Sequence, residues 1–199
     1  KLTPEERKEQ KRYAKLADAF TPMGKGMSTE FANRNTYDAI QVHGGSGFMK
    51  DYTCERLYRD ARITNIYEGT TQLQVVAAIR HVTTGTYLSI LREYEAMEYK
   101  PELLSLKQDL IAMTDTYEQL VTKVTGAKDN EYLDFLARRL VEAATHCVFG
   151  YLLLQSTHTD NSFLSSMQVY LRYGKAEMYK IRSFIENFSI EDLKAYRRE

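Results

Sequence analysis

The stretch I-Y-E-G-T-T-Q-L-Q, residues 66–74, marks the point where a glycine-containing bend gives way to a long helical pattern. Glu68 stands at its centre, between the aromatic ring of Tyr67 and Gly69, which permits close approach of another backbone. A carboxylate on such a bend is a candidate general base. The alternative is a solvated loop glutamate followed by a glycine that only serves the turn. The nonapeptide alone leaves both interpretations open.

The helix after this bend is expected to begin at Thr70 or Thr71, because either hydroxyl can cap it. Its free N–H groups and the positive end of its dipole then face the bend, where an anionic ligand group can sit. We expect this helix to continue to about Met97, since apolar and aromatic residues recur every three or four positions. The repeating residues are Leu73, Val76, Ile79, Thr83, Tyr87, Ile90, Tyr94 and Met97.

A second glycine-rich loop, Q-V-H-G-G-S-G-F, occupies residues 41–48. Gly44 and Gly45 tolerate positive φ, so they can end a helix that Ser28 begins. Successive N–H groups in such a turn can also cradle an anion. His43 has no second ligand at a helical or turn spacing, which favours an ordinary loop histidine over a metal ligand.

A short helix is expected between the two loops, over residues 53–62. Within it Glu55 and Arg59 stand four residues apart, as do Arg56 and Asp60, so ordinary surface ion pairs explain these charges. The alternative is a buried brace that holds the bend with its glutamate, and the sequence does not separate the two.

The N-terminal segment, residues 3–19, is expected to form a charged helix that a capping box opens. We expect a break or kink over residues 21–26, because Pro22 removes a backbone donor and two glycines follow it. With only 3 prolines and 10 glycines in the chain, helix is the default elsewhere.

The C-terminal half predicts an antiparallel helical bundle, and hence an all-α fold. It follows a composition break at residues 98–101 that we interpret as a domain boundary. Apolar residues then recur every three or four positions in helices joined by short polar turns, which is typical of core-facing stripes. The stripes are Leu103, Leu106, Leu110, Met113, Tyr117, Leu120 and Val124; Tyr132, Leu136, Leu140, Ala143, Cys147, Tyr151 and Leu154; and Phe163, Met167, Tyr170, Gly174, Met178, Ile181, Ile185 and Phe188, before a short terminal helix that Ser189 caps.

Composition narrows the class of protein. Lys plus Arg equals Asp plus Glu at 27 each, so nothing indicates nucleic acid or a membrane surface as a partner. Two distant cysteines, Cys54 and Cys147, argue against a disulfide framework and for a reducing compartment. No segment reaches the roughly 20 apolar residues of a membrane span, and no secretory leader is evident. We expect a cytoplasmic protein, or one of the mitochondrial matrix if the source is eukaryotic.

Together, Q-V-H-G-G-S-G-F, E-R-L-Y-R-D-A-R-I and I-Y-E-G-T-T-Q-L-Q, in this order and at this spacing, resemble the C-terminal segment of the acyl-CoA dehydrogenases. The resemblance covers about residues 10–97. Residues 98–199 match no motif and are similar to the helical C-terminal extension of some larger members. We therefore expect two domains, 1–97 and 98–199, in a fragment of a longer chain that lacks the N-terminal helical domain and the middle β domain.

The resemblance implies an FAD-dependent flavoprotein oxidoreductase of fatty acid metabolism that oxidises acyl-CoA thioesters to trans-2-enoyl-CoA. Glu68 matches the base that takes the α-proton, while N5 of FAD accepts the β-hydride. Members that place the base on another helix carry a small residue here, so a glutamate favours the commoner arrangement. Thr70 and Gln72 match residues that contact the flavin or its diphosphate. Tyr67 matches a wall of the acyl pocket, with Gly69 beside it in the substrate site.

The resemblance also implies partners. Gln41 and the Gly44–Gly45 turn match a loop that reaches the FAD of a neighbouring subunit, so a homo-oligomer, dimer or tetramer, is expected. The electron-transfer flavoprotein is the expected acceptor, and no metal is implied. Without the β domain, the fragment alone is expected to bind flavin weakly or not at all and to be inactive.

Two alternatives stay open. The first is a helical oligomerisation or interaction module without catalysis. The enzyme needs Glu68 to face a cleft, whereas this module would leave Glu68 solvated or paired with Arg59 or Arg62. The second is an acyl-CoA oxidase, which shares the proton and hydride chemistry but passes its electrons to oxygen.

Overall fold

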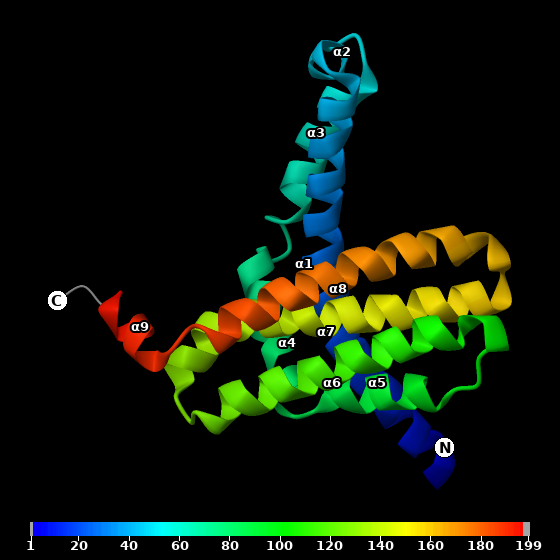
Figure 1. Ribbon diagram of the computed structural model, residues 1–199, viewed down its shortest axis with the longest axis vertical. Coiled ribbons are helices and arrows are strands. Elements are labelled where there is room, and N and C mark those ends of the chain that lie inside the picture. The colour runs from blue at the N-terminus through cyan, green and yellow to red at the C-terminus, as the bar shows by residue number, and fades with distance from the viewer. Residues whose placement is uncertain (1, 197–199) are drawn as a thin grey trace. The chain divides into compact units, whose positions relative to one another are not determined.

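The computed structural model describes residues 2–196, which form helices and no strand (Figure 1). The chain divides into two compact units, Lys1–Ala78 (unit 1) and Ile79–Glu199 (unit 2). The expected all-α class is confirmed. The helices are α1 (Pro4–His43), α2 (Gly45–Phe48), α3 (Thr53–Thr64), α4 (Thr71–Thr83), α5 (Thr86–Ala96), α6 (Leu104–Gly126), α7 (Asn130–Thr159), α8 (Leu164–Glu186) and α9 (Ile190–Ala195), with 3-10 turns η1 (Pro101–Leu103) and η2 (Asn161–Phe163).

Unit 1 is a helical hairpin in which α3 returns alongside α1 after the short α2 at the tip (Figure 1). The expected capping box opens α1: the Glu6 N–H donates to the Thr3 hydroxyl at 3.2 Å, and the Thr3 N–H donates to the Glu6 carboxylate at 2.7 Å. Asn33 of α1 donates to the Ala61 carbonyl of α3 at 2.9 Å. This cross-helix bond ties the two arms together near the base of the hairpin.

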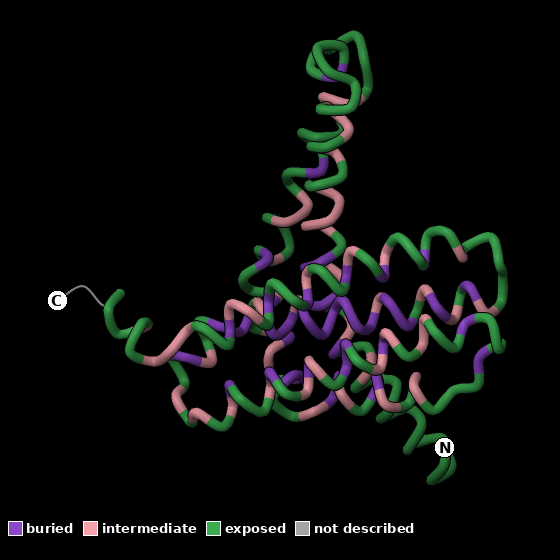
Figure 2. The backbone as a smooth tube through the Cα atoms, in the orientation of Figure 1, coloured by how far each residue is buried: buried purple, intermediate pink, exposed green. Residues whose placement is uncertain are grey.

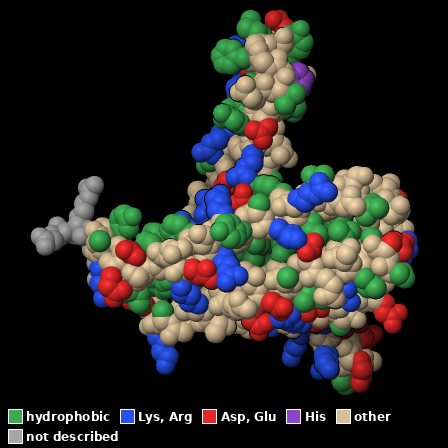
Figure 3. All heavy atoms as spheres, viewed as in Figure 1, with side chains coloured by type: hydrophobic (Ala, Val, Ile, Leu, Met, Phe, Trp, Pro, Cys, Tyr) green, Lys and Arg blue, Asp and Glu red, His purple; other side chains and the backbone are tan. Residues whose placement is uncertain are grey.

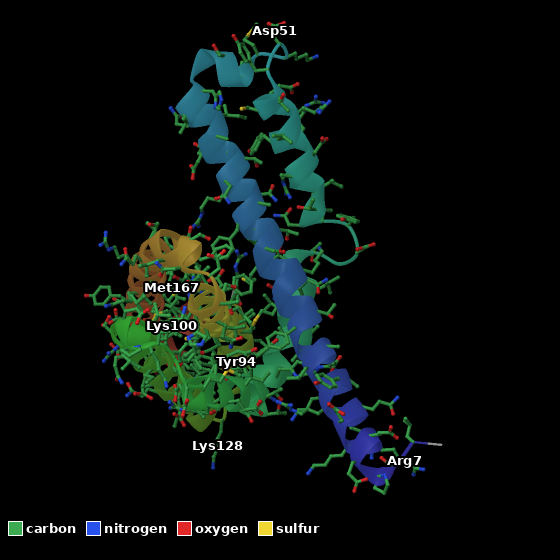
Figure 4. The ribbon with its side chains drawn as sticks, turned by 90° about the vertical axis from the view of Figure 1, so that its right-hand side faces the viewer. Arg7, Asp51, Tyr94, Lys100, Lys128 and Met167 are labelled. Carbon is green, nitrogen blue, oxygen red and sulfur yellow. The ribbon has the colours of Figure 1, made fainter. Side chains whose placement is uncertain are left out.

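The break expected over residues 21–26 is wrong, because α1 runs through Pro22 as one helix of 40 residues. Figure 4 shows it uninterrupted from near Arg7 towards the tip that carries Asp51. Pro22 and Met23 are buried, and tertiary packing can override a weak local propensity. A Cβ on Gly26 would lie 3.1 Å from the Cβ of Gln74, so this glycine lets α1 approach α4 closely.

Two other local expectations are also wrong. Ser28 does not cap a helix; it lies inside α1, and its hydroxyl donates to the Gly24 carbonyl four residues back at 2.5 Å. The helix expected over residues 70–97 is divided into α4 and α5. Gly85 adopts a φ of 70° between them, a left-handed conformation that only glycine takes readily. The expected stripe is not one buried face: Leu73, Val76 and Thr83 are exposed, whereas Tyr87 and Ile90 are buried.

The bend between α3 and α4 has an unusual backbone. Gly69 has a φ of 95°, which costs a glycine nothing, but Glu68 has a φ of 53°. For a residue with a Cβ, the left-handed region costs about 1 kcal/mol. After the bend, α4 begins at Thr71, and the Leu73 N–H donates to the Thr70 hydroxyl at 3.4 Å, which agrees with Thr70 as the cap.

Unit 2 is an antiparallel bundle in which α7 packs against α5, α6 and α8 (Figure 1). Buried residues run along nearly the whole length of α7 (Figure 2). The stripes expected from the sequence form this core, although Phe163 at the edge is 43 % exposed. Their buried members are Leu103, Leu110, Met113, Tyr117, Leu120 and Val124 on the α6 side, Tyr132, Leu136, Leu140, Ala143, Cys147, Tyr151 and Leu154 on α7, and Met167, Gly174, Met178, Ile181 and Ile185 on α8.

The division into packing units differs from the sequence domains expected at 1–97 and 98–199. Residues 79–97 belong to unit 2, since α5 packs on α6 and α7. Packing units and sequence domains are different divisions of a chain, so the domain assignment stays a prediction.

The short terminal helix begins as expected. The Asp192 N–H donates to the Ser189 hydroxyl at 3.1 Å, and the Ser189 N–H donates to the Asp192 carboxylate at 2.8 Å, which completes a capping box for α9. Across residues 2–196, no helix combines the length and the apolar character that crossing a membrane requires.

Cys147 should be inert in the folded protein. It is fully buried in unit 2, and burial raises the pKa of its thiol to about 12. Because the thiolate is the reactive form, an alkylating reagent at neutral pH should label the half-buried Cys54 and leave Cys147 unmodified. Mass spectrometry should find one label before denaturation and two after it. Labelling of Cys147 in the native protein would show that this core opens.

The backbone at Glu68 predicts an unusual order of variant stabilities. Glu68→Gly should be more stable than Glu68→Ala by about 1 kcal/mol, because only glycine takes a positive φ without a steric cost. The control is the exposed helical residue Lys8, where alanine should be more stable than glycine by about the same amount. Urea unfolding measures both pairs, and the same order at the two positions would contradict a positive φ at Glu68.

Candidate active site

The site residues expected from the sequence fall into two groups, both in unit 1. The bend site consists of Tyr67, Glu68, Gly69, Thr70 and Gln72, on the bend and the first turn of α4. The tip site consists of Gln41, Gly44 and Gly45, at the end of α1 and the start of α2. All of these residues are exposed except Gly69, which is half-buried. Both groups are therefore accessible to a ligand or a partner surface.

The two sites do not meet within one chain. They lie at opposite ends of α3, as Figure 1 shows for the bend before α4 and for α2 at the tip. A helix of 12 residues is about 18 Å long at 1.5 Å per residue. The structure thus brings the five bend-site residues together and keeps Gln41, Gly44 and Gly45 away from them.

The bend site is held by two side chains that the sequence analysis missed. The Lys25 ammonium of α1 donates to the Gly69 carbonyl at 2.5 Å and lies 5.7 Å from the centre of the Tyr67 ring. The Gln74 amide of α4 donates to the Glu68 carbonyl at 3.1 Å and to the Gly69 carbonyl at 3.4 Å. Gln74 lies inside the quoted motif, but its spacing does not indicate a hydrogen bond to the bend. Lys25 could not be identified from local sequence, because it is 44 residues from its acceptor.

Glu30 of α1 holds both ends of the same bend. Its carboxylate accepts a hydrogen bond from the Thr71 hydroxyl at 2.6 Å and another from the Asn65 amide at 3.3 Å. The Thr71 N–H in turn donates to the Asn65 carbonyl at 3.3 Å. The segment that carries Glu68 is therefore closed into a loop against α1.

The Glu68 carboxylate is exposed and makes no hydrogen bond or ion pair among residues 2–196. The two arginines that could pair with it have other partners. Arg59 pairs with Glu55 at 2.9 Å, and its side chain is 65 % exposed, so the surface ion pair is confirmed rather than a buried brace. Arg62 donates to the Asn65 side chain. Glu68 is therefore accessible to a ligand, and an exposed carboxylate here is also what the interaction module would leave.

The tip site has the backbone of a helix end. Gly44 has a φ of 59°, and its N–H donates to the Gln41 carbonyl at 3.2 Å, so the expected C-terminal cap of α1 is confirmed. Gly47, which is buried in α2, is required by packing: a Cβ there would lie 2.8 Å from the Ile40 carbonyl oxygen. The turn is thus a compact one.

A hollow of about 820 Å³ lies beside Gln41. Hydrophobic side chains gather around α2 on the face shown in Figure 3. His43, at the same end, is hydrogen-bonded through Nδ1 to the Ala39 carbonyl at 2.8 Å, and residues 2–196 contain no group of three or more metal-ligating side chains. The hollow beside Gln41 is lined by both aromatic and charged residues: Tyr37, Ile40, Gln41, Phe48, Met49, Lys50, Asp51, Glu55, Tyr58 and Arg59.

Comparison with known proteins shows two adjoining matches to family models. The model "Acyl-CoA dehydrogenase, C-terminal domain" matches residues 5–83, and the model "Acyl-CoA dehydrogenase C terminal" matches residues 83–193. The second covers more than half of the 199 residues. Of the curated relatives, an acyl-CoA dehydrogenase of Bacillus subtilis is 44 % identical over 64 residues, which are 32 % of this chain and 17 % of that protein.

Solved structures agree. An acyl-CoA dehydrogenase family protein from Porphyromonas gingivalis is 54 % identical, with a TM-score of 0.55, over 57 % of this chain and 98 % of that one. An acyl-CoA dehydrogenase from Bacillus anthracis, solved in complex with FAD, matches 89 % of this chain and 33 % of its own at 21 % identity, with a TM-score of 0.58, which shows the fold alone.

This chain spans less than a fifth of the length of the first curated relatives that it matches. Nevertheless, both halves match the family, one over residues 5–83 and the other over residues 83–193. The chain belongs to the acyl-CoA dehydrogenase family.

Proposed function

We propose that this chain supplies the catalytic base of an FAD-dependent acyl-CoA dehydrogenase. Glu68 removes the α-proton of an acyl-CoA thioester, and the β-hydride leaves to the flavin, which gives trans-2-enoyl-CoA. The observation that supports this most is the left-handed backbone of Glu68, on a bend that side chains from two helices anchor. A strained residue that its surroundings hold in place is a reason to infer function.

Proton removal next to a thioester carbonyl sets two demands. The carboxylate must lie within hydrogen-bonding reach of the α-carbon, and the site must be dry enough to bring its pKa towards the working pH. Glu68 is accessible for the first demand, because it is exposed and unpaired. The second demand requires another surface that shields Glu68 from water, and exposed apolar side chains on the bend and on α4 can pack against such a surface. They are Ile66, Tyr67, Leu73 and Val76, which are 43, 49, 58 and 59 % exposed.

The residues at the start of α4 suit a flavin dinucleotide. Thr70 and Gln72 are exposed and offer a hydroxyl and an amide as donors, while the N-terminus of α4 favours negative charge. FAD, when bound, supplies the hydride acceptor that no amino acid side chain provides. Tyr67 and Gly69 lie beside the acyl group in this proposal.

The tip site supports the proposal of a homo-oligomer. Gln41, Gly44 and Gly45 lie about one α3 length from Glu68 and are exposed, so they are free to contact the FAD of a neighbouring subunit. The exposed Val42 and Phe48, at 85 and 76 %, favour burial of this end against another surface. The proposal therefore includes a role of the hairpin in subunit contact. We also propose the electron-transfer flavoprotein as the electron acceptor.

Glu68→Gln in the intact enzyme should abolish turnover and leave flavin bound. Glutamine keeps the size of the side chain but cannot accept the α-proton at neutral pH. The measurement is the rate of enoyl-CoA formation per bound flavin, with the exposed acid of unit 2, Glu102→Gln, as the control that should keep full activity. Dehydrogenation by Glu68→Gln at the wild-type rate would remove Glu68 from this role.

The 199-residue chain alone should purify colourless and inactive. The proposed flavin contacts Thr70 and Gln72 lie on an open surface at the start of α4, which encloses too little of a dinucleotide to retain it. The absorption spectrum of the purified chain, before and after addition of FAD and gel filtration, measures this. A yellow protein that keeps FAD through the column would contradict the expectation.

A further inference from the structure

We infer that Lys25 and Gln74 are positioning residues for Glu68, so that they govern the rate of proton removal without contacting the substrate. The inference rests on the proposed role of Glu68 as the base. It is carried by the three hydrogen bonds that these side chains donate to the Glu68 and Gly69 carbonyls, at 2.5, 3.1 and 3.4 Å.

Holding the two carbonyls fixes the path of the backbone through Glu68. A peptide unit is planar, so the direction of its C=O also sets the direction of the N–H that follows it. Gln74 holds the peptide between Glu68 and Gly69, and Lys25 together with Gln74 holds the peptide after Gly69. On the other side, the Tyr67 N–H donates to the Ile63 carbonyl at 3.1 Å. This N–H belongs to the peptide between Ile66 and Tyr67, so Glu68 is restrained directly on its C-terminal side and one peptide further away on its N-terminal side.

These restraints matter because the conformation is unfavourable by itself. At a φ of 53° Glu68 gains stability if φ returns to a negative value, and such a rotation would swing its Cβ and carboxylate in a new direction. Solvation can replace the lost hydrogen bonds at this exposed bend, so release would cost little in overall stability. The expected consequence of losing the two donors is therefore a misdirected base in a folded protein.

The position of Gln74 is tightly determined. A Cβ on Gly69 would lie 2.8 Å from its amide nitrogen, and a Cβ on Gly26 would lie 3.1 Å from its Cβ. The side chain is therefore enclosed between α1 and the bend and has little freedom to make other contacts. Such close packing is what locks a supporting side chain into one rotamer.

Lys25 serves a second residue of the bend site. Its ammonium lies 5.7 Å from the centre of the Tyr67 ring, within the range of a cation–π interaction. A single side chain thus orients both the backbone next to the proposed base and the proposed wall of the acyl pocket. Arginine can keep a positive charge and N–H donors at this position, whereas methionine keeps only the apolar stem.

The test uses the intact, flavin-loaded enzyme with Lys25→Met, Lys25→Arg and Gln74→Leu. We expect kcat per bound flavin to fall roughly 10- to 100-fold in Lys25→Met and Gln74→Leu, the effect of moving a reacting group by about 1 Å. KM should change much less, because the substrate contacts remain. The kinetic isotope effect with α-deuterated acyl-CoA should rise, since proton removal becomes more rate-limiting. Lys25→Arg should recover part of the loss.

The matched control is Ser28→Ala, which removes a side-chain hydrogen bond that stays within α1. It should leave kcat per flavin and the isotope effect unchanged. If Lys25→Met does not fold, Gln74→Leu alone tests the inference, because Gln74 lies on α4 and its substitution leaves α1 unchanged. Wild-type kcat per flavin and an unchanged isotope effect in Gln74→Leu would overturn the inference. Full turnover by Glu68→Gln would instead overturn the proposed function, so the two failures are distinguishable.

Discussion

The conformation of one bend depends on side chains that reach it from two helices. Lys25 of α1 and Gln74 of α4 donate hydrogen bonds to consecutive backbone carbonyls, and these bonds hold Glu68 at a positive φ that a glutamate does not adopt by preference. Glu30 closes the ends of the same segment. The continuity of α1 through Pro22 belongs to this arrangement, since a helix that ended there would not carry Lys25, Gly26 and Glu30 to the bend on one rigid element.

The sequence predicts the helices and the core of unit 2 well because those depend on local periodicity. Cys147 and Tyr151 are buried where their spacing places them. It predicts less well where a tertiary contact or a single backbone angle decides. Pro22 lies buried inside a continuous α1, and Gly85 divides in two a helix that the apolar spacing predicts as one. A local pattern contains no information about either outcome.

The same distinction applies to the site. The motif around Glu68 identifies the bend, and the structure places its five predicted residues together. Lys25 escapes detection because it acts across 44 residues of sequence, and a lysine in a charged helix carries no mark of that role. The resemblance also implies that the tip site acts on a neighbouring subunit. The two sites lie about one length of α3 apart in the structure, at opposite ends of that helix.

The most direct test of a flavin-linked base at Glu68 is anaerobic mixing of the intact, flavin-loaded protein with a panel of acyl-CoA thioesters. Removal of the α-proton and transfer of the β-hydride reduce the flavin, so its yellow absorption should bleach with a saturated acyl-CoA and not with CoA alone. An oxidised flavin that persists with every acyl-CoA, in a protein whose flavin dithionite does reduce, would contradict the account.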